Sequence, residues 1–189
     1  MTKNSIPPNP LSEQEERDGN RKSIQALPPL EANFTLLPNE LFDKWLPKFR
    51  SLAEMKVVFY IARHTYGFHK LFDCLSLNQF RHGVTRPDGT KLDNGTGLKE
   101  DHIIRGLRQA EEDGFILSYR FGPPGKEQKL YFINCEESKG LLQLLKEGVI
   151  EPEALLKGMK LEQLVKKYPG IVRSQYLTKS PYLEDDNPG

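Results

Sequence analysis

Residues 96–133 read TGLKEDHIIRGLRQAEEDGFILSYRFGPPGKEQKLYFI, and the spacing of the apolar residues changes halfway along this stretch. In the first half they recur at helical spacing, at Leu98, Ile103, Leu107 and Ala110. Gly114 follows, and glycine suits a helix C-terminus. Over 115–121 and again over 129–133 apolar and polar residues alternate, as in strands, on either side of a Gly-Pro-Pro-Gly break. The stretch predicts a helix over 98–113 followed by a β-hairpin with a long tip.

Three further helices are expected ahead of this stretch. Residues 39–45 form an apolar-rich segment bracketed by Pro38 and Pro47. Ser51 with Glu54, and Ser76 with Gln79, have the three-residue spacing of capping boxes, so each pair is expected to open a helix. The helix after Ser51 is expected to place its apolar face at Leu52, Met55, Val58, Phe59 and Ala62. Residues 84–97 are rich in Gly, Pro, Asp, Asn and Thr, which predicts a loop.

The expected order is helix, helix, short helix, loop, polar-faced helix and hairpin, which is the element order of a winged helix-turn-helix domain. We therefore expect a mainly α fold with a small β-hairpin over residues 34–135. Residues 1–33 are rich in proline and charge and are expected to be a disordered arm. Residues 136–173 carry leucine-rich short helices that either pack on the domain or await a partner. Residues 174–189 are expected to be a disordered acidic tail.

The charge of the chain is nearly balanced, with 27 Lys and Arg against 26 Asp and Glu. Residues 34–133 hold fifteen against twelve and all four histidines, which is a mild positive tilt compared with a strongly basic DNA-binding face. No apolar run is long enough for a membrane span, and the polar N-terminus does not read as a signal peptide, so we expect a cytoplasmic protein. Cys74 and Cys135 are expected to be reduced, half-buried thiols.

Several segments resemble the N-terminal domain of the bacteriophage replication protein O family. They are Phe34-Thr35, Pro38-Asn39-Glu40-Leu41, the run IARHTYGFHK at 61–70, LSLNQF at 75–80, and Thr96-Gly97-Leu98 leading through Ile103, Arg105, Leu107 and Gly114 to Phe115-Ile116. The resemblance covers about a hundred of the 189 residues. It implies binding to repeated sites in a phage or plasmid origin, and recruitment of the replicative helicase or its loader through a separate C-terminal region. The loop over 85–94 is longer than the usual turn of that family.

The candidate DNA-binding residues lie on the polar face of the predicted helix and on the hairpin. Long donors on a helix in the major groove reach base edges and phosphates. The helix contributes Lys99, His102, Arg105, Arg108 and Gln109, and the hairpin contributes Arg120, Lys126 and Lys129. Arg105 is the first choice because the matching position of the family is usually basic. The alternatives are a solvated helix face and basic residues that only protect exposed edge strands.

Two acids, Glu100 and Asp101, open the predicted helix. They suit the positive end of the helix dipole but repel phosphate. We expect them to face away from the DNA backbone or to accept a hydrogen bond from a cytosine amine.

Other chemistries find less support in the sequence. Gly125-Lys126 is the Gly-Lys pair of a nucleotide-binding loop, but Arg120 stands at the position of the first glycine and Glu127 replaces the metal-binding Ser or Thr. The metal-ligand types His64, His69, Cys74 and His82 match no compact zinc pattern and are expected to be structural. The aromatic residues that stack bases in other proteins are here expected to be core, and they are Tyr60, Tyr66, Phe68 and Phe72. We expect no catalysis, no metal and no cofactor.

The leading hypothesis is sequence-specific binding of double-stranded DNA in phage or plasmid replication initiation. One alternative is a transcriptional regulator on the same fold, and another is a protein–protein adaptor that never contacts DNA. A homodimer on DNA is a further possibility that the sequence does not decide. The leucine segments form no sustained heptads of the kind that dimerise many regulators, which favours the initiator.

Overall fold

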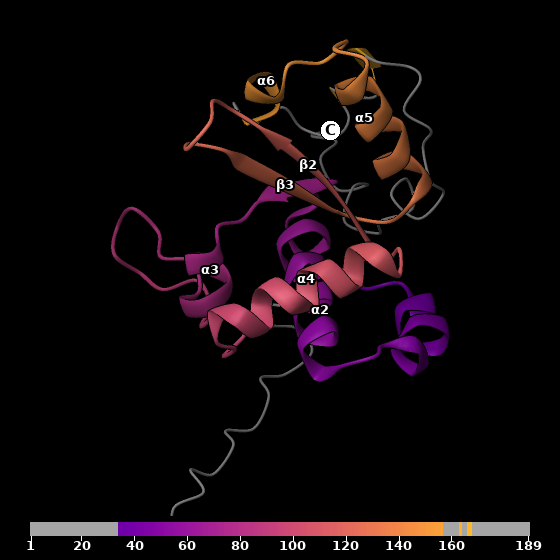
Figure 1. The fold of residues 1–189 in the computed structure, drawn as a ribbon, viewed down its shortest axis with the longest axis vertical. Helices are drawn as coiled ribbons and strands as arrows, with labels where there is room; N and C mark the ends of the chain where they lie inside the picture. Colours follow the sequence, from indigo (N-terminus) through magenta and orange to yellow (C-terminus); the bar gives the residue numbers. More distant parts are fainter. Residues whose placement is uncertain (1–33, 157–162, 164–165, 168–189) are drawn as a thin grey trace, which may run out of the picture. The chain divides into compact units, whose positions relative to one another are not determined.

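The computed structural model describes residues 34–156, 163 and 166–167 (Figure 1). Their elements belong to one compact unit that begins at Thr35. The elements follow in the order η1 (Leu41–Trp45, a π-helical turn), η2 (Leu46–Lys48, a 3₁₀ turn), α2 (Leu52–Thr65), η3 (Tyr66–Phe68, a 3₁₀ turn), β1 (Phe72–Cys74), α3 (Leu77–His82), α4 (Glu100–Glu112), β2 (Ile116–Phe121), β3 (Gln128–Ile133), α5 (Glu136–Lys146) and α6 (Pro152–Leu156). The expected disordered arm over 1–33 and acidic tail over 174–189 lie outside the described residues.

The fold is helix-rich with one small antiparallel sheet, whose strand order is β1-β3-β2. The hairpin expected from the sequence is β2–β3, with Tyr119 opposite Leu130. The third strand, β1, was not expected, and it places Asp73 opposite Tyr131 on the other edge of β3. Three residues are too few to show an alternating pattern, so only the pairing reveals this strand.

One face of the sheet packs on α2, α3 and α4. The core here is formed by Val57 and Ile61 of α2 and by residues of the other elements, among them Phe80, Ile103, Leu107, Ala110, Ile116 and Tyr131. The predicted apolar face of α2 was wrong at Leu52, which is 60% exposed, whereas Ala53 and Val57 are buried. Leu52 points to solvent because Ala53 and Glu54, which follow it, are the residues that lie against α4.

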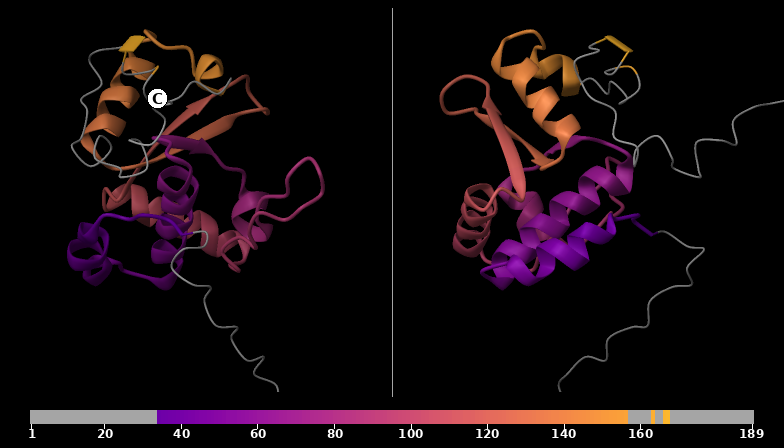
Figure 2. Two further views of the ribbon diagram at one scale, coloured as in Figure 1. Left: turned by 180° about the vertical axis from the view of Figure 1, so that it is seen from behind. Right: turned by 90° about the vertical axis from the view of Figure 1, so that its right-hand side faces the viewer.

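The other face of the sheet is covered by α5 and α6. Leu141 and Leu145 of α5, Ile150 of the connecting turn and Leu155 of α6 share a buried cluster with Leu130 and Phe132 of β3 and with Leu71. Figures 1 and 2 show these helices on one side of the sheet, with α2 and α4 on the other. Of the two alternatives for the leucine-rich helices, the described ones therefore pack on the domain. The leucines expected in a further helix near 161–165 lie outside the described residues.

The two expected capping boxes differ in the structure. At α3 both bonds form, since the Ser76 hydroxyl accepts from the Gln79 amide and the Gln79 side chain accepts from the Ser76 amide. At α2 the Ser51 hydroxyl accepts from the Glu54 amide, but the buried Glu54 carboxylate accepts from the amide of Arg50, at 2.6 Å. The first helical segment also continues through Pro47, because the chain tightens to a 3₁₀ turn there.

Across the part of the chain that the structure describes, every helix is too short or too polar to cross a bilayer.

Candidate nucleic-acid interface

Helix α4 divides sharply into a buried and an exposed face. Ile103, Gly106, Leu107 and Ala110 are buried, and they point at the core that α4 shares with α2. The exposed side carries Asp101, Ile104, Arg105, Arg108 and Glu112. Figure 1 shows α4 lying across the front of the domain, and the right-hand view of Figure 2 shows the tip of the β2–β3 hairpin on the same side as α4. These residues therefore form a surface that an extended partner can reach.

The N-terminal end of α4 is held by side chains from other elements. The Nζ atom of Lys56 in α2 donates to the carbonyl oxygen of Thr96, at 3.1 Å. The Thr96 hydroxyl donates to the carbonyl oxygen of Phe80 in α3, at 2.8 Å, and is itself buried. The segment entering α4 is thus tied to both α2 and α3.

The C-terminal end of α4 is held by the start of α2 and by the sheet. The Arg50 guanidinium bonds the carboxylate of Asp113 and the carbonyl oxygen of Gln109. The Ser51 hydroxyl donates to the Gln109 side chain, at 2.8 Å. From β3, Lys129 forms an ion pair with Glu111, at 2.5 Å. Because both ends are fixed, the exposed face of α4 has one direction relative to the domain.

Two candidate DNA-binding residues take part in contacts within the domain. Gln109 was expected to face a groove, but its side chain is half-buried and accepts a bond from Ser51. Lys129 was expected near the hairpin tip, but it pairs with Glu111 and lies 5.2 Å above the ring of Tyr131. Both residues serve inside the domain, so the structure does not bring them to the exposed face of α4.

The remaining candidates are exposed or half-exposed. Arg105 has no acidic partner within ion-pairing distance among the described residues, and Lys99 and Lys126 are likewise exposed without such a partner. Two others are in loose ion pairs, Arg108 with Glu112 at 3.6 Å and Arg120 with Glu127 at 3.4 Å, and His102 lies 3.6 Å from the carboxylate of Asp101. Exposed pairs of this kind are weak, so these side chains are available to a phosphate or a base.

Ile104 was not singled out from the sequence, and it is 51% exposed beside Arg105 on the outer face of α4. Its position next to Ile103 is the sequence signal that could have identified it as exposed. Two consecutive apolar residues on an amphipathic helix cannot both face the core, because neighbours are about 100° apart.

His64 is buried and lies between two carboxylates, with its Nε2 atom near Asp93 and its Nδ1 atom near Asp73. The hydroxyl of Tyr60 donates to the Asp93 carboxylate at 3.0 Å. Burial, with the nearby Asp93 charge, raises the pKa of Tyr60 above its ordinary value, so the hydroxyl keeps the proton that it donates. His64 therefore acts as a structural histidine. The described residues contain no cluster of three or more side chains suited to a metal ion.

The four aromatic residues that were expected in the core differ in how far they are buried. Tyr60 is buried, and Tyr66 and Phe72 are half-buried against the cores. The expectation that Phe68 is a core residue was wrong, because its side chain is 37% exposed and its ring contacts the cations of Arg63 and Lys70. Phe68 escapes the core because it falls in the 3₁₀ turn η3, where the chain leaves α2.

An open cavity of about 440 Å³ lies beside the C-terminal end of α4. It is lined by Trp45, Lys48, Arg50, Asp113, Gly114, Phe115 and Asn134. The ion pair between Arg50 and Asp113 occupies its polar wall, so this cavity belongs to the contacts that hold α4.

Comparison of the chain with known protein families, with curated proteins and with solved structures found no match. The chemistry of α4 and of the elements around it is therefore what bears on function.

Proposed function

We propose that this chain is a winged helix-turn-helix protein that binds double-stranded DNA through α4. The order of α2, β1, α3, α4 and the β2–β3 hairpin, with β3 central in the sheet, carries the proposal. In helix-turn-helix proteins the second helix of the motif lies in the major groove, and here that helix is α4. Its fixed direction and exposed face support the same assignment.

The side chains of the exposed face have complementary chemistry. Arg105 and Arg108 are long donors suited to guanine edges or to phosphates. Ile104 offers an apolar surface of the kind that contacts the methyl group of thymine. Lys126 lies at the exposed tip of the hairpin, which would follow the adjacent stretch of DNA.

The acids in the first turn of α4 are compatible with this arrangement. Glu100 and Asp101 lie where the helix dipole stabilises negative charge. Asp101 shares the exposed face with Arg105 and would accept from a cytosine amine in the proposed complex.

The biological role within this proposal is replication initiation on a phage or plasmid, in the cytoplasm. It rests on the resemblance of residues 34–35, 38–41, 61–70, 75–80 and of positions within 96–116 to the replication protein O family. A replicative helicase or its loader would then be engaged by the C-terminal region, and two copies would sit on a repeated site. A transcriptional regulator would use the same surface on a promoter in place of an origin.

The charge of α4 favours a second candidate, a protein–protein adaptor. The helix and its ends carry five acids, Glu100, Asp101, Glu111, Glu112 and Asp113, against the cations Lys99, Arg105 and Arg108. An exposed Ile104 among mixed charges is also suited to a protein partner. This candidate predicts that the chain has no affinity for duplex DNA.

A salt-titrated binding assay tests the proposal. The full chain is titrated against labelled duplexes from around its own gene and against a scrambled duplex, beside an Arg105→Ala/Arg108→Ala variant. A Lys44→Ala/Lys146→Ala variant removes the same charge from exposed positions on η1 and α5. We expect a log-log salt slope of roughly −4 to −5 if about five phosphates are contacted. The α4 variant should lose at least about tenfold in affinity, the size of one good base contact. No binding to any duplex at low salt, or an α4 variant that binds as well as the Lys44→Ala/Lys146→Ala control, overturns the proposal. Equal binding of all duplexes would overturn the role in recognising an origin.

A further inference from the structure

The segment between α3 and α4 is an ordered hairpin, although its composition predicted a loop. The amide of Leu92 donates to the carbonyl oxygen of Val84 at 2.8 Å, and the amide of Arg86 donates to that of Thr90 at 2.8 Å. Thr85 and Lys91 pair as an isolated antiparallel bridge. We call residues 84–92 the α3–α4 hairpin.

The base of the α3–α4 hairpin is fixed to the domain. Gly83 and Asp93 approach so closely that a Cβ on Gly83 would meet the Asp93 carbonyl oxygen at 2.0 Å. The Asp93 carboxylate then bonds His64 and Tyr60 of α2. Because His64 is buried, this anchor lies in the interior of the domain. The hairpin is therefore a defined projection of the fold.

The acids and the cations of the α3–α4 hairpin differ in the contacts that they make. Asp93 is used at the base, and the Oδ1 atom of Asp88 accepts from both the amide and the hydroxyl of Thr90. Arg86 and Lys91 are exposed, and neither forms an ion pair with a residue that the structure describes. Hydrogen bonds from Thr90, and to a smaller extent the charge of Arg86, lower the pKa of Asp88. Arg86 is thus near an acid of its own hairpin, but no ion pair with a described residue holds either cation, so both side chains can reach a partner.

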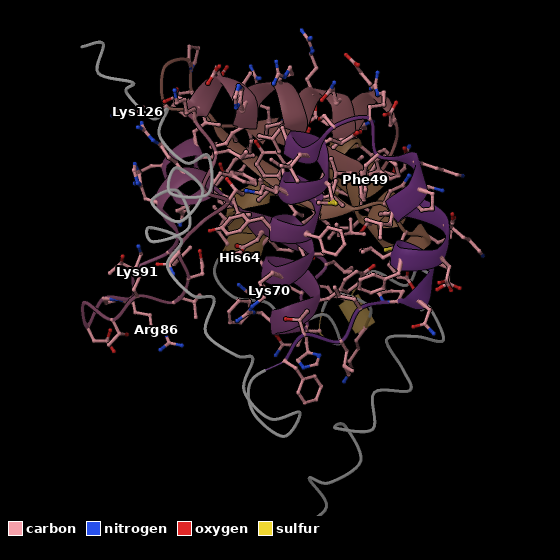
Figure 3. The ribbon with its side chains drawn as sticks, turned by 90° about the horizontal axis from the view of Figure 1, so that it is seen from below. Phe49, His64, Lys70, Arg86, Lys91 and Lys126 are labelled. Atoms are coloured by element: carbon pink, nitrogen blue, oxygen red, sulfur yellow. The ribbon has the colours of Figure 1, made fainter. Side chains whose placement is uncertain are left out.

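The hairpin projects from the same side of the domain as the tip of β2–β3. Figure 1 shows both tips at the left of the domain. In Figure 3, seen from below, Arg86, Lys91 and Lys126 again lie along the left-hand edge. The chain returns from the hairpin directly to the N-terminal end of α4. The α3–α4 hairpin therefore adds two cations on the side of the domain where the β2–β3 tip lies, with Lys126 nearer to α4 and with Lys91 and Arg86 farther from it (Figure 3).

We infer that the α3–α4 hairpin is a second DNA-contacting element, in which Arg86 and Lys91 bind backbone phosphates beside the groove that α4 occupies. This inference rests on the proposed DNA binding. Phosphate is the partner that the chemistry fits, because the tip itself is Pro87-Asp88-Gly89-Thr90 and has no long donor to select a base. The contact contributes affinity and register without sequence preference.

An Arg86→Ala/Lys91→Ala variant of the full chain tests this inference. The backbone bonds of the hairpin do not use these side chains, and circular dichroism checks that the variant is folded. Each phosphate contact contributes about −0.9 to the log-log salt slope, so the slope should become less negative by about 2. Affinity should fall by the same factor on the preferred and the scrambled duplex. The charge-preserving Arg86→Lys/Lys91→Arg variant should keep the original slope.

The Lys44→Ala/Lys146→Ala variant is the matched control, since it changes the net charge equally at exposed sites on η1 and α5. If the hairpin variant matches this control while the unmodified chain binds DNA, the hairpin inference is overturned and the proposed function stands. A loss confined to the preferred duplex would mean base recognition and would also overturn the phosphate assignment. If the unmodified chain binds no duplex at low salt, both proposals fail together.

Discussion

The Nε2 atom of His64 lies 3.1 Å from the Oδ2 atom of Asp93, and this contact joins the interior of α2 to the base of the α3–α4 hairpin. The other ring nitrogen faces Asp73, 3.4 Å away, at the start of the sheet. Helix α2, strand β1 and the base of the α3–α4 hairpin therefore meet at one buried side chain.

Replacing His64 with alanine should lower the free energy of unfolding by about 2–3 kcal/mol, because two partly buried carboxylates each lose one of their partners and a cavity forms. Hydrogen exchange of the amides of Arg86 and Leu92 should also accelerate more than exchange in β3. Urea unfolding measures the first effect. Exposed His82 gives the matched control, His82→Ala, and a loss no larger than that of the control would contradict this role for His64.

Gly106→Ala tests the crossing of α2 and α4. A Cβ at this position would lie 2.7 Å from the carbonyl oxygen of Ala53, a backbone atom that cannot move alone. Alanine raises intrinsic helix stability by about 1 kcal/mol, but overpacking costs about 1–3 kcal/mol. We expect a net loss of stability, measured by thermal or urea unfolding. We also expect weaker DNA binding, because α4 is displaced. The exposed control Arg108→Ala should unfold like the unmodified chain, and a stabilised Gly106→Ala variant would show that the helices do not approach this closely.

Ile104→Ala should change stability by no more than about 0.5 kcal/mol, because the side chain is half-exposed. If Ile104 contacts a thymine methyl, affinity for the preferred duplex should fall about fivefold, the size of a small apolar contact. Replacing single thymines by uracil removes the methyl from the DNA side. At the thymine that Ile104 contacts, uracil should weaken binding by the unmodified chain but not by the variant. Equal effects of uracil on both proteins would exclude the contact.

The buried carboxyl of Glu54 predicts a pH dependence of stability. Burial is the largest cause that raises its pKa above the ordinary value of 4.5, and its Oε1 atom has no hydrogen-bond partner among the described residues. A pKa raised by folding adds stability that is present below pH 4.5 and is lost as the pH rises through the folded value.

Glu54→Gln removes this titration. The unfolding free energy of the variant, minus that of the unmodified chain, should therefore increase between about pH 4.5 and neutral pH. Urea unfolding at a series of pH values measures the difference, with Glu153→Gln, at an exposed position of α6, as the control. A difference that stays constant with pH would show that Glu54 does not titrate in this way.

Local patterns predicted the helices and the hairpin well. The spacing of Ile103, Leu107 and Ala110 located the buried face of α4, and Ser76 with Gln79 marked the start of α3. Strand β1 was missed because its three residues gain their structure only from pairing with β3. The α3–α4 hairpin was expected as a loop, since Gly, Pro and Asp are as common in tight turns as in irregular segments.

Of the candidate site, the sequence predicted only which residues share the exposed face of one helix. Arg105 and Arg108 were placed correctly on the exposed side of α4. Gln109 and Lys129 could not be, because their partners Ser51 and Glu111 come from other elements, 58 and 18 residues away in sequence. Long-range pairing decides which polar side chains are free, and it leaves no mark in local periodicity.

The division of α4 between a buried and an exposed face has a consequence for how such a protein diversifies. The residues that set the direction of the helix, such as Gly106 and Leu107, are separate from those that would meet a partner, such as Ile104 and Arg105. Substitutions at the outer positions are nearly neutral for folding, so a lineage can explore new binding targets while the scaffold stays intact. Substitutions at the crossing with α2 have no such freedom, and selection against unfolding should keep the inner face of α4 the slower to change.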